Sequence, residues 1–362
     1  MLDNYYAVIM AGGGGTRLWP VSRQSRPKQL LHFASSESLF QSAVRRMEGL
    51  FPNERILVVT TQEQAIQLQE QCPQIPPENF LLEPLPRGTA AVVGLAAAAL
   101  EKHDPNASMA VLTSDHFIGD EEKFRNLLLT AYEVAQQNYL VTLGVTPTYA
   151  ATGYGYIQNG EKLGSFNGLE VYQALRFKEK PDEIQARQMI QDGNHSWNSG
   201  MFVWRVKDIL KEFQRQMPSF YGHIQKIAEA WDSPERLPVL QSTWPLLQVN
   251  TIDYGVMEGA KKVAVIAAEG LGWNDVGSWE SIFEILPKDT HGNVISAEQN
   301  LLLETQDTLV YTTQNNRMIV TIGVKDLLIV DTGDVLLVCN REQSQKVRQV
   351  VNQLKQLGSS YL

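Results

Sequence analysis

The residues best suited to chemistry lie near the start of the chain, where a short apolar run ends in four glycines. Gly12 to Gly15 are followed at once by Thr16 and the fixed cation Arg17. Glycine has no Cβ and reaches positive φ, so the amides of such a run can approach a ligand closely. Consecutive amides form a concavity that binds anions, and the planar guanidinium of arginine fits phosphate oxygens. The loop therefore predicts a site for a phosphate chain rather than a flexible surface turn.

The spacing of this loop argues against two common nucleotide-binding motifs. A Walker loop ends in Gly-Lys-Ser/Thr, whereas here Gly15 is followed by Thr16 and Arg17. In the dinucleotide fingerprint G-x-G-x-x-G, the third glycine would fall on Arg17 or Leu18, depending on the register. Neither a P-loop NTPase nor a Rossmann dehydrogenase is indicated.

Three more charged residues are candidates for phosphate or metal chemistry. Lys28 follows Arg17 by eleven residues and, taken alone, is typical of a solvated surface lysine. Asp115 ends a predicted strand over 109–116, where it suits either a magnesium ligand or the N-cap of a predicted helix over 121–137. Asp275 lies between aromatic residues and a glycine, where solubility gives little reason for an acid.

A polar group follows the strand predicted over 80–84. Glu83 lies at its end, and Gly88 and Thr89 lead into a nearly all-apolar helix over 90–100, with Thr89 as its expected N-cap. Packing alone explains the alanines of this helix but not the polar residues before it. Ligands of α/β proteins bind at the carboxyl ends of strands, so this turn is a second candidate site.

Composition places the chain among ordinary globular proteins. Its 362 residues are 43% hydrophobic and 20% charged, and they exceed what a single core usually supports. The formal net charge of −9 argues against a nucleic-acid-binding or membrane-binding surface, so a phosphorylated ligand would meet only a few local cations. The two cysteines form no disulfide framework, and we find neither a signal peptide nor an apolar run of membrane-spanning length. We therefore expect a cytoplasmic protein that binds neither nucleic acid nor membrane.

Hydrophobic patterning predicts a large α/β domain followed by a small β domain. Strands predicted over 56–60 and 140–145 alternate with helices, which favours βαβ units and a Rossmann-like, mixed but mostly parallel sheet flanked by helices. Antiparallel strands are expected over 154–157 and 169–178. Beyond residue 286, short strands about ten residues apart predict a small β-solenoid or β-roll, closed by a terminal helix. The expected domains are 1–286 and 287–362.

Six motifs in this order resemble those of the sugar-1-phosphate nucleotidylyltransferases, and among them the mannose-1-phosphate guanylyltransferases, also called GDP-mannose pyrophosphorylases. The motifs cover 11–29, 112–116, 177–181, 197–202, 252–258 and 273–279. The resemblance implies the nucleotide-diphospho-sugar transferase fold. Because the chain ends at Leu362, it is also expected to lack the isomerase domain that longer family members carry.

The resemblance also implies roles for individual residues. Catalytic and phosphate-binding roles would belong to the cations Arg17, Lys28 and Lys180. Nucleotide contacts would come from Gly12, Gly13, Gly14, Gly15, Thr16, Glu83, Gly88, Thr89 and Ser114. The mannose would lie among Gly155, Glu179, Asn198 and Asp253. Asp115 and Asp275 would share one Mg²⁺ ion.

The implied reaction is in-line attack of mannose 1-phosphate on the α-phosphate of GTP, giving GDP-mannose and pyrophosphate, by an enzyme expected to be a homodimer. One alternative is another member of the class, such as an enzyme that joins glucose 1-phosphate to TTP. A second alternative is a non-catalytic sugar-nucleotide-binding regulator. The chain has Gly88 to Ala91 where the family commonly has Asn-Thr-Ala-Pro, so the choice of base is less firmly indicated than the transfer chemistry.

Overall fold

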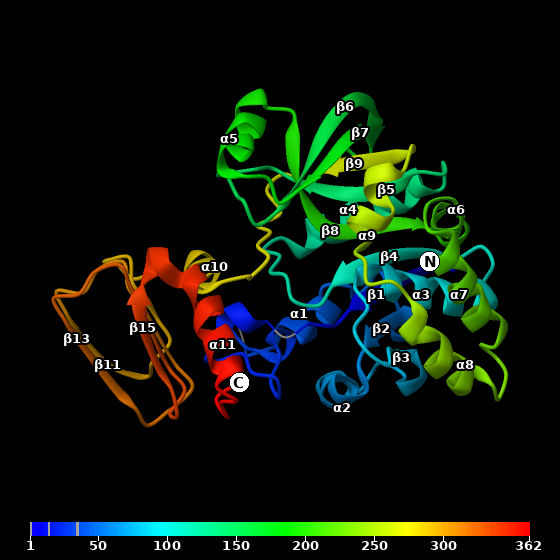
Figure 1. Ribbon diagram of the computed structural model, residues 1–362. Coiled ribbons are helices and arrows are strands. Elements are labelled where there is room, and N and C mark those ends of the chain that lie inside the picture. Colours follow the sequence, from blue (N-terminus) through cyan, green and yellow to red (C-terminus); the bar gives the residue numbers. More distant parts are fainter. Residues whose placement is uncertain (1, 14, 34–35) are drawn as a thin grey trace. The chain divides into compact units, whose positions relative to one another are not determined.

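The computed structural model describes residues 2–13, 15–33 and 36–362 (Figure 1). They form two compact units that each combine distant parts of the sequence. The first unit contains the chain up to Gly12, Val44–Ser114 and Ile118–Trp273. The second contains Gly13–Ala43, Asp115–Phe117 and Asn274–Leu362. None of the helices in the described part of the chain is both long and apolar enough to span a bilayer.

The first unit is built on a nine-stranded mixed sheet with the order β3-β2-β1-β4-β8-β5-β9-β7-β6. The strands β3, β2, β1 and β4 pair in parallel in this order. Strands β8, β7 and β6 pair antiparallel with their neighbours. The strands are β1 (Tyr5–Met10), β2 (Ile56–Thr60), β3 (Phe80–Leu82), β4 (Ser108–Thr113), β5 (Leu140–Val145), β6 (Gly155–Phe166), β7 (Leu169–Glu179), β8 (His195–Arg205) and β9 (Val263–Ala267). The predicted Rossmann-like mixed sheet is confirmed. Its parallel pairings lie among the four N-terminal strands and between β5 and β9.

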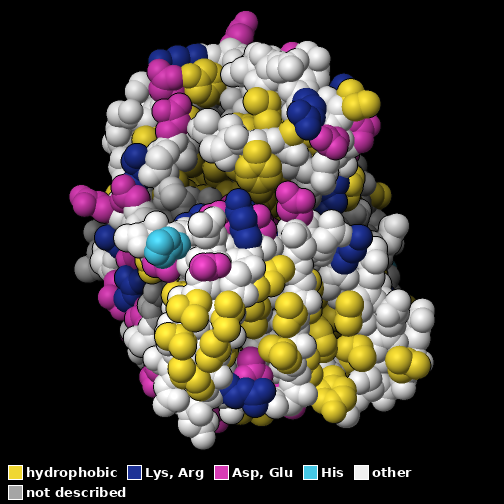
Figure 2. Space-filling model, turned by 90° about the vertical axis from the view of Figure 1, so that its left-hand side faces the viewer, with side chains coloured by type: hydrophobic (Ala, Val, Ile, Leu, Met, Phe, Trp, Pro, Cys, Tyr) yellow, Lys and Arg dark blue, Asp and Glu magenta, His cyan; other side chains and the backbone are white. Residues whose placement is uncertain are grey.

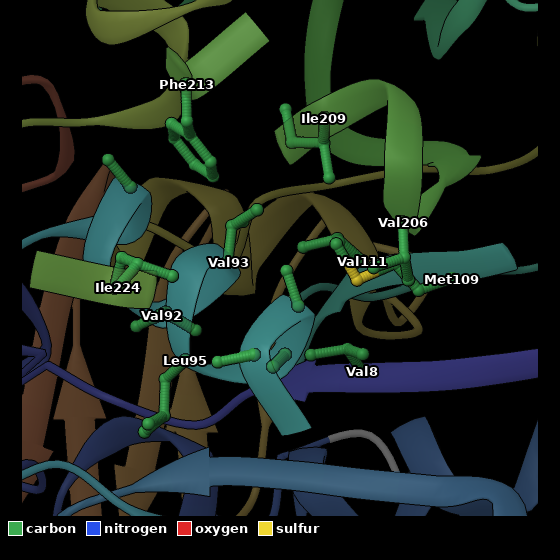
Figure 3. Close-up of a cluster of buried hydrophobic side chains, with 14 of the residues drawn as sticks. Val8, Val92, Val93, Leu95, Met109, Val111, Val206, Ile209, Phe213 and Ile224 are labelled. Carbon is green, nitrogen blue, oxygen red and sulfur yellow. The ribbon is translucent and has the colours of Figure 1, made fainter. Parts of the chain in front are cut away.

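Helices pack along this sheet, and several of them share a buried core with its strands. They are α2 (Gln62–Gln71), α3 (Thr89–His103), α4 (Glu121–Ala135), α5 (Glu183–Asp192), α6 (Val206–Gln216), α7 (Pro218–Glu229), α8 (Arg236–Thr243) and the single turn α9 (Ile252–Gly255). Figure 3 shows Val93 of α3 among side chains from α6 and α7, including Ile209, Phe213 and Ile224. The alanines of α3 allow this close approach, because bulkier residues would hold the neighbouring helices apart.

The second unit contains the predicted short β repeats. Strands β10 (Val294–Ile295), β12 (Leu309–Thr312), β14 (Leu327–Asp331) and β15 (Leu336–Asn340) form one sheet, while β11 (Gln299–Leu303) and β13 (Met318–Ile322) form another. Leu309 pairs in parallel with Leu328, and Leu301 pairs in parallel with Val320, so these strands belong to successive turns of a coil. Strand β15 ends the first sheet and runs antiparallel to β14. The predicted β-solenoid is confirmed.

Short helices complete the second unit. They are α1 (Leu39–Arg45), which begins in this unit, α10 (Trp279–Ile285) and α11 (Val347–Gln356). Trp279 is fully buried in the core of the unit, and its indole nitrogen donates to the carbonyl of Trp19 at 2.9 Å. The glycine-loop segment therefore packs with the β-solenoid side of the chain, although the two are far apart in sequence.

Candidate nucleotide and sugar site

The glycine loop has backbone conformations that only glycine adopts easily. Gly13 has φ of +101°, and Gly15 has φ of +54°. A Cβ on Gly15 would also overlap the side chain of Lys28, so the loop and this lysine are in close contact. The hydroxyl of Ser22 donates to the Gly15 carbonyl at 2.6 Å and holds the turn from its other side. Gly14 lies outside the described residues.

Thr16 and Arg17 begin a single 3₁₀ turn that ends at Leu18. Leu18 is buried and anchors the turn, whereas Arg17 is exposed to solvent. An exposed guanidinium beside glycines of positive φ is available to an anionic ligand.

Lys28 is buried in the second unit, where it contacts both Asp115 and Asp275, and it is not the solvated lysine that its sequence context indicates. Only 7% of the residue is exposed. Its ammonium lies 2.9 Å from Oδ2 of Asp115 and donates to the backbone carbonyl of Asp275 at 2.5 Å. The structure thus brings together one cation and two acids that the sequence separates widely.

Asp115 is held in its charged form by this arrangement. Burial by itself raises the pKa of its carboxyl, but the nearby Lys28 ammonium, together with His116, outweighs burial and holds the pKa below its ordinary value. The alternative role of Asp115 as a helix N-cap is wrong. Asp120 caps α4, since its Oδ1 accepts from the amide of Lys123 at 2.9 Å.

Asp275 projects from a turn that its neighbours hold in an unusual conformation. Val276 has φ of +49°, which a β-branched residue rarely adopts, and it is fully buried. Asn274 accepts from the Val276 amide at 2.7 Å, and the Asp275 carboxylate accepts from the Gly277 amide at 3.0 Å. A Cβ on Gly277 would overlap that carboxylate. Asn274 and Gly277 were given no role from sequence, although both lie inside the 273–279 motif.

These residues also bear on metal binding. Within the described ranges, no cluster of three or more His, Cys, Asp or Glu side chains could hold a metal ion. Mg²⁺, however, commonly takes only one or two carboxylates and completes its shell with water and phosphate oxygens. Asp115 and Asp275 supply two carboxylates, and Gly277 leaves room for the second, so this donor set fits Mg²⁺.

In the first unit, Glu83 is a buried acid directly after β3. It is 4% exposed, and its Oε2 atom has no hydrogen-bond partner in the described part of the chain. Burial raises the pKa of Glu83 to about 7, an effect that the Arg87 amide only partly offsets. Gly12 faces this carboxyl, since a Cβ built there would lie 3.5 Å from Oε1. Glu83 can therefore exist in either protonation state near neutral pH.

The turn after Glu83 differs in one detail from the sequence-based expectation. The N-cap of α3 is Gly88, with φ of +86°, and not Thr89. Glycine is required because a Cβ would overlap the carbonyl of Asn250. Thr89 is the first residue of α3, and its hydroxyl accepts from the amide of Ile252 at 2.9 Å. The threonine thus ties α3 to α9 instead of capping its own helix.

Ser114 follows β4 and is 1% exposed. Its amide donates to the carbonyl of Met10 at the end of β1, at 3.3 Å. Its position at the carboxyl ends of two parallel strands is where α/β proteins bind ligands.

The four residues predicted around the sugar come together within the first unit, from β6, β7, β8 and α9. The Asn198 amide donates to Oδ1 of Asp253 at 2.7 Å. A Cβ on Gly155 would overlap the Glu179 carboxylate and lie 3.4 Å from Cβ of Asn198. Burial raises the pKa of Asp253, and the Asn198 amide opposes this rise. The group offers amide and carboxyl oxygens of the kind that bind hydroxyls.

Lys180 lies at the end of this group and is mostly exposed. Its ammonium is 2.5 Å from Oε1 of Glu179. Its φ of +45° is unusual for a residue other than glycine, and it places the lysine beyond the last strand residue.

Trp197 has a different environment from its neighbour Asn198, because both lie within β8, where successive side chains point to opposite faces. The Trp197 ring packs at 5.0 Å from those of Tyr149 and Tyr154 and at 6.4 Å from that of Trp273. Asn198 thus contacts the predicted sugar residue Asp253, whereas Trp197 packs among aromatic rings.

Comparison with known proteins gives a consistent result. A family model described as nucleotidyl transferase matches residues 6–292, and one described as MannoseP isomerase/GMP-like beta-helix domain matches residues 298–354. The chain is 36% identical to a mannose-1-phosphate guanylyltransferase of Klebsiella pneumoniae, over 96% of this chain and 74% of that protein. It is 35% identical to the protein of that name from Escherichia coli K12, over 98% of this chain and 74% of the relative.

A solved structure covers almost the whole chain. The crystal structure named mannose-1-phosphate geranyltransferase, from Thermus thermophilus, matches with a TM-score of 0.87 and 32% identity. The match covers 97% of this chain and 99% of that one. Both the mixed sheet and the β-solenoid therefore have a counterpart in a single solved protein.

Proposed function

Since the chain belongs to the nucleotidyl transferase family, we propose that it transfers GMP from GTP to α-D-mannose 1-phosphate, with release of pyrophosphate and formation of GDP-mannose. The relatives that match nearly all of the chain bear the name of this activity. The structural observation that carries the proposal is the buried ion pair of Lys28 and Asp115, which lies beside the backbone of Asp275.

The chemistry asks for charge and positioning rather than for a strong base. A sugar phosphate is already ionised at neutral pH, so its oxygen can attack the α-phosphate of a nucleotide without losing a proton. Lys28 and Arg17 would stabilise the negative charge that develops there, and the loop amides would bind the phosphate chain. Asp115 and Asp275 would hold Mg²⁺, which would supply Lewis-acid neutralisation of the phosphate oxygens.

Recognition of the two substrates is assigned to the first unit. Guanine presents ring and exocyclic N–H donors, and the buried carboxyl of Glu83 is an acceptor suited to them. Asn198, Asp253 and Glu179 would hydrogen-bond the mannose hydroxyls. Lys180, exposed at the end of β7, would bind the sugar phosphate.

The test is pyrophosphate release in the presence of Mg²⁺, with mannose 1-phosphate and glucose 1-phosphate each combined with GTP, ATP, UTP and TTP. We expect turnover to be fastest with mannose 1-phosphate and GTP. Activity confined to glucose 1-phosphate with TTP would show a different member of the class. Absence of turnover with every pair would show a binding protein.

The proposed assembly is a homodimer formed through one face of the β-solenoid. Figure 2 shows hydrophobic side chains gathered on the exposed surface of the second unit. Because Leu301 pairs with Val320 and Leu303 pairs with Ile322, these residues and Met318 lie on one face of the β11–β13 ladder. Each is 49–66% exposed.

Apolar side chains on one flat ladder are typical of a protein interface rather than of a solvated face. A stable interface buries on the order of 800 Å² on each partner, and five such side chains with their flanking residues supply much of that area. A second copy of the chain is the partner that is always present at matching concentration.

Light scattering of Val320→Glu/Ile322→Glu tests this assembly, because two buried carboxylates would oppose the contact. The expected result is a dimer for the wild type and a monomer for the variant. Leu357→Glu, at an exposed position outside the ladder, should stay dimeric. A monomeric wild type, or a variant that stays dimeric, would contradict the proposal.

A further inference from the structure

A pocket of about 480 Å³ lies in the first unit between helix α5 and the strands β6, β7 and β8. Figure 1 shows α5 beside the hairpin of β6 and β7. The volume is within the range of roughly 300–1,000 Å³ that is usual for sites of small organic ligands. None of the residues assigned to the nucleotide or the sugar lines this pocket.

The pocket and the sugar residues occupy opposite faces of the same strands. Residues directly opposite each other in antiparallel strands share a face, and successive residues alternate between faces. Tyr156 lies opposite Lys178, and Gln158 lies opposite Arg176; all four line the pocket. Gly155 and Glu179, the adjacent pair in the ladder, belong to the sugar side.

The charges that line the pocket favour an anion. Arg176 and Lys178 are two residues apart on β7, and neither forms an ion pair with any acid in the described ranges. Asp192 is the acid that lines the same pocket, and its Oδ1 accepts from the Gln188 amide at 2.9 Å. Two unpaired cations beside one acid that is already hydrogen-bonded leave the pocket with positive charge. Arginine is suited to bidentate binding of a phosphate.

The floor of the pocket contains polar atoms without partners. Tyr156 is 1% exposed, and its hydroxyl is buried without a hydrogen-bond partner among the described residues. Nδ1 of His195 is in the same situation. A buried polar group without a partner costs about 1–3 kcal/mol, so such groups usually meet a ligand or water. With the amides of Gln158 and Gln188, they form a surface that would hydrogen-bond a hydroxyl-rich body.

We propose that this pocket binds a phosphorylated sugar or polyol as a second ligand, and that its occupancy alters the affinity of the sugar site across the sheet. The cations would bind the phosphate, and the Tyr156 hydroxyl with the glutamine amides would bind the hydroxyls. The two sites are directly connected through the backbone, because Tyr156 follows Gly155 and Lys178 precedes Glu179 in the sequence. A ligand that orders the strands from one face changes the free energy of binding on the other.

Calorimetric titration of the full chain with glucose 6-phosphate tests the binding claim without any need for turnover. We expect Arg176→Ala to weaken binding at least about tenfold, since it removes a charged hydrogen-bond donor. Tyr156→Phe, which keeps the ring and removes the hydroxyl, should weaken binding by a smaller factor.

Two matched variants control for the titration. Arg187→Ala also removes an arginine near the pocket, but Arg187 pairs with Glu183 at 2.6 Å and does not line it, so binding should be unchanged. Asn198→Ala alters the sugar face and should also retain binding of glucose 6-phosphate. The Arg176→Ala variant should then lose the effect of glucose 6-phosphate on the KM for mannose 1-phosphate, while the wild type shows a shift.

Several outcomes would overturn the proposal. They are an absence of binding by the wild type, equal affinity in Arg176→Ala, or loss of binding in Asn198→Ala, which would place the probe in the sugar site. Inorganic phosphate that binds as tightly as glucose 6-phosphate would indicate an adventitious ion only. A shift in the KM for mannose 1-phosphate that persists in Arg176→Ala would exclude the coupling. A separate result, the absence of pyrophosphate release, would contradict the proposed transferase activity.

Discussion

The carboxyl groups of the two candidate groups have pKa values that are shifted in opposite directions. In the second unit, the ammonium of Lys28 contacts the carboxylate of Asp115 and lowers the pKa of that acid against the effect of burial. In the first unit, Glu83 is a buried acid and Asp253 a partly buried one, and burial is the main cause that raises the pKa of each.

This difference in pKa is consistent with two different roles, phosphoryl transfer and substrate recognition. Fixed opposite charges suit phosphoryl chemistry, in which negative charge on the transferred group must be neutralised. A carboxyl whose pKa is raised by burial suits recognition, because its oxygens can form hydrogen bonds to a base or a sugar in a site with few cations. The comparison therefore supports the proposal that the second group acts in catalysis and the first in selection of substrates.

The largest effect should follow from removing charge in the second group. Asp115→Asn and Asp275→Asn keep the side-chain shape but lose the carboxylate, and each should lower kcat by about 10³-fold. Pyrophosphate release measures the rate, and circular dichroism with thermal melting checks the fold. Asp3→Asn, which changes an acid with an 86% exposed side chain, is the control and should leave kcat unchanged. Near-normal rates in both site variants would remove these acids from the transfer chemistry.

A smaller effect is expected from the acid of raised pKa in the first group. The folded protein holds the Glu83 proton up to a pKa of about 7, whereas the unfolded chain releases it near 4.5. The stability of the wild type should therefore fall, relative to Glu83→Gln, as the pH rises from about 4.5 to about 7. The total change is at most roughly 3 kcal/mol. Denaturant unfolding at several pH values measures it, and parallel curves would contradict the raised pKa.

Glu83 also predicts how the binding of the nucleotide depends on pH. Donors on guanine favour the ionised carboxylate, so the affinity for GTP should decline as the pH falls below about 7. Titration of GTP into the wild type and into Glu83→Gln, with ATP as the control nucleotide, tests this. A pH-independent affinity in the wild type would place the base elsewhere.

The smallest effect is expected from the sugar residues, where no net charge is lost. Asn198→Ala removes the amide that donates to Asp253 and should raise the KM for mannose 1-phosphate about tenfold, with a smaller change in kcat. Asn106→Ala, at an exposed position in a turn, is the matched control. A fall in kcat with unchanged KM would show that Asn198 acts in the transfer step instead.

Much of the fold could be predicted because the local patterns are strong. The strands over 56–60 and 140–145 have the predicted bounds, since unbroken apolar runs of this length suit buried strands. The N-cap of α3 was predicted wrongly, because a threonine before an apolar helix is a good local capping signal. The actual position of Gly88 depends on Asn250, which contacts it from a distant part of the chain.

The sequence by itself determined the chemical inventory: a glycine loop with its arginine, a small set of acids and cations, and an α/β pattern that ends in short β repeats. Only the tertiary structure decided that Lys28 is buried between Asp115 and Asp275, that Glu83 has a pKa of about 7, and that Tyr156 faces a pocket away from Gly155. The physical reason is the distance along the sequence over which each kind of interaction acts. Strand and turn preferences act over a few residues, whereas burial and ion pairing depend on residues that the folded chain brings together from far apart in sequence.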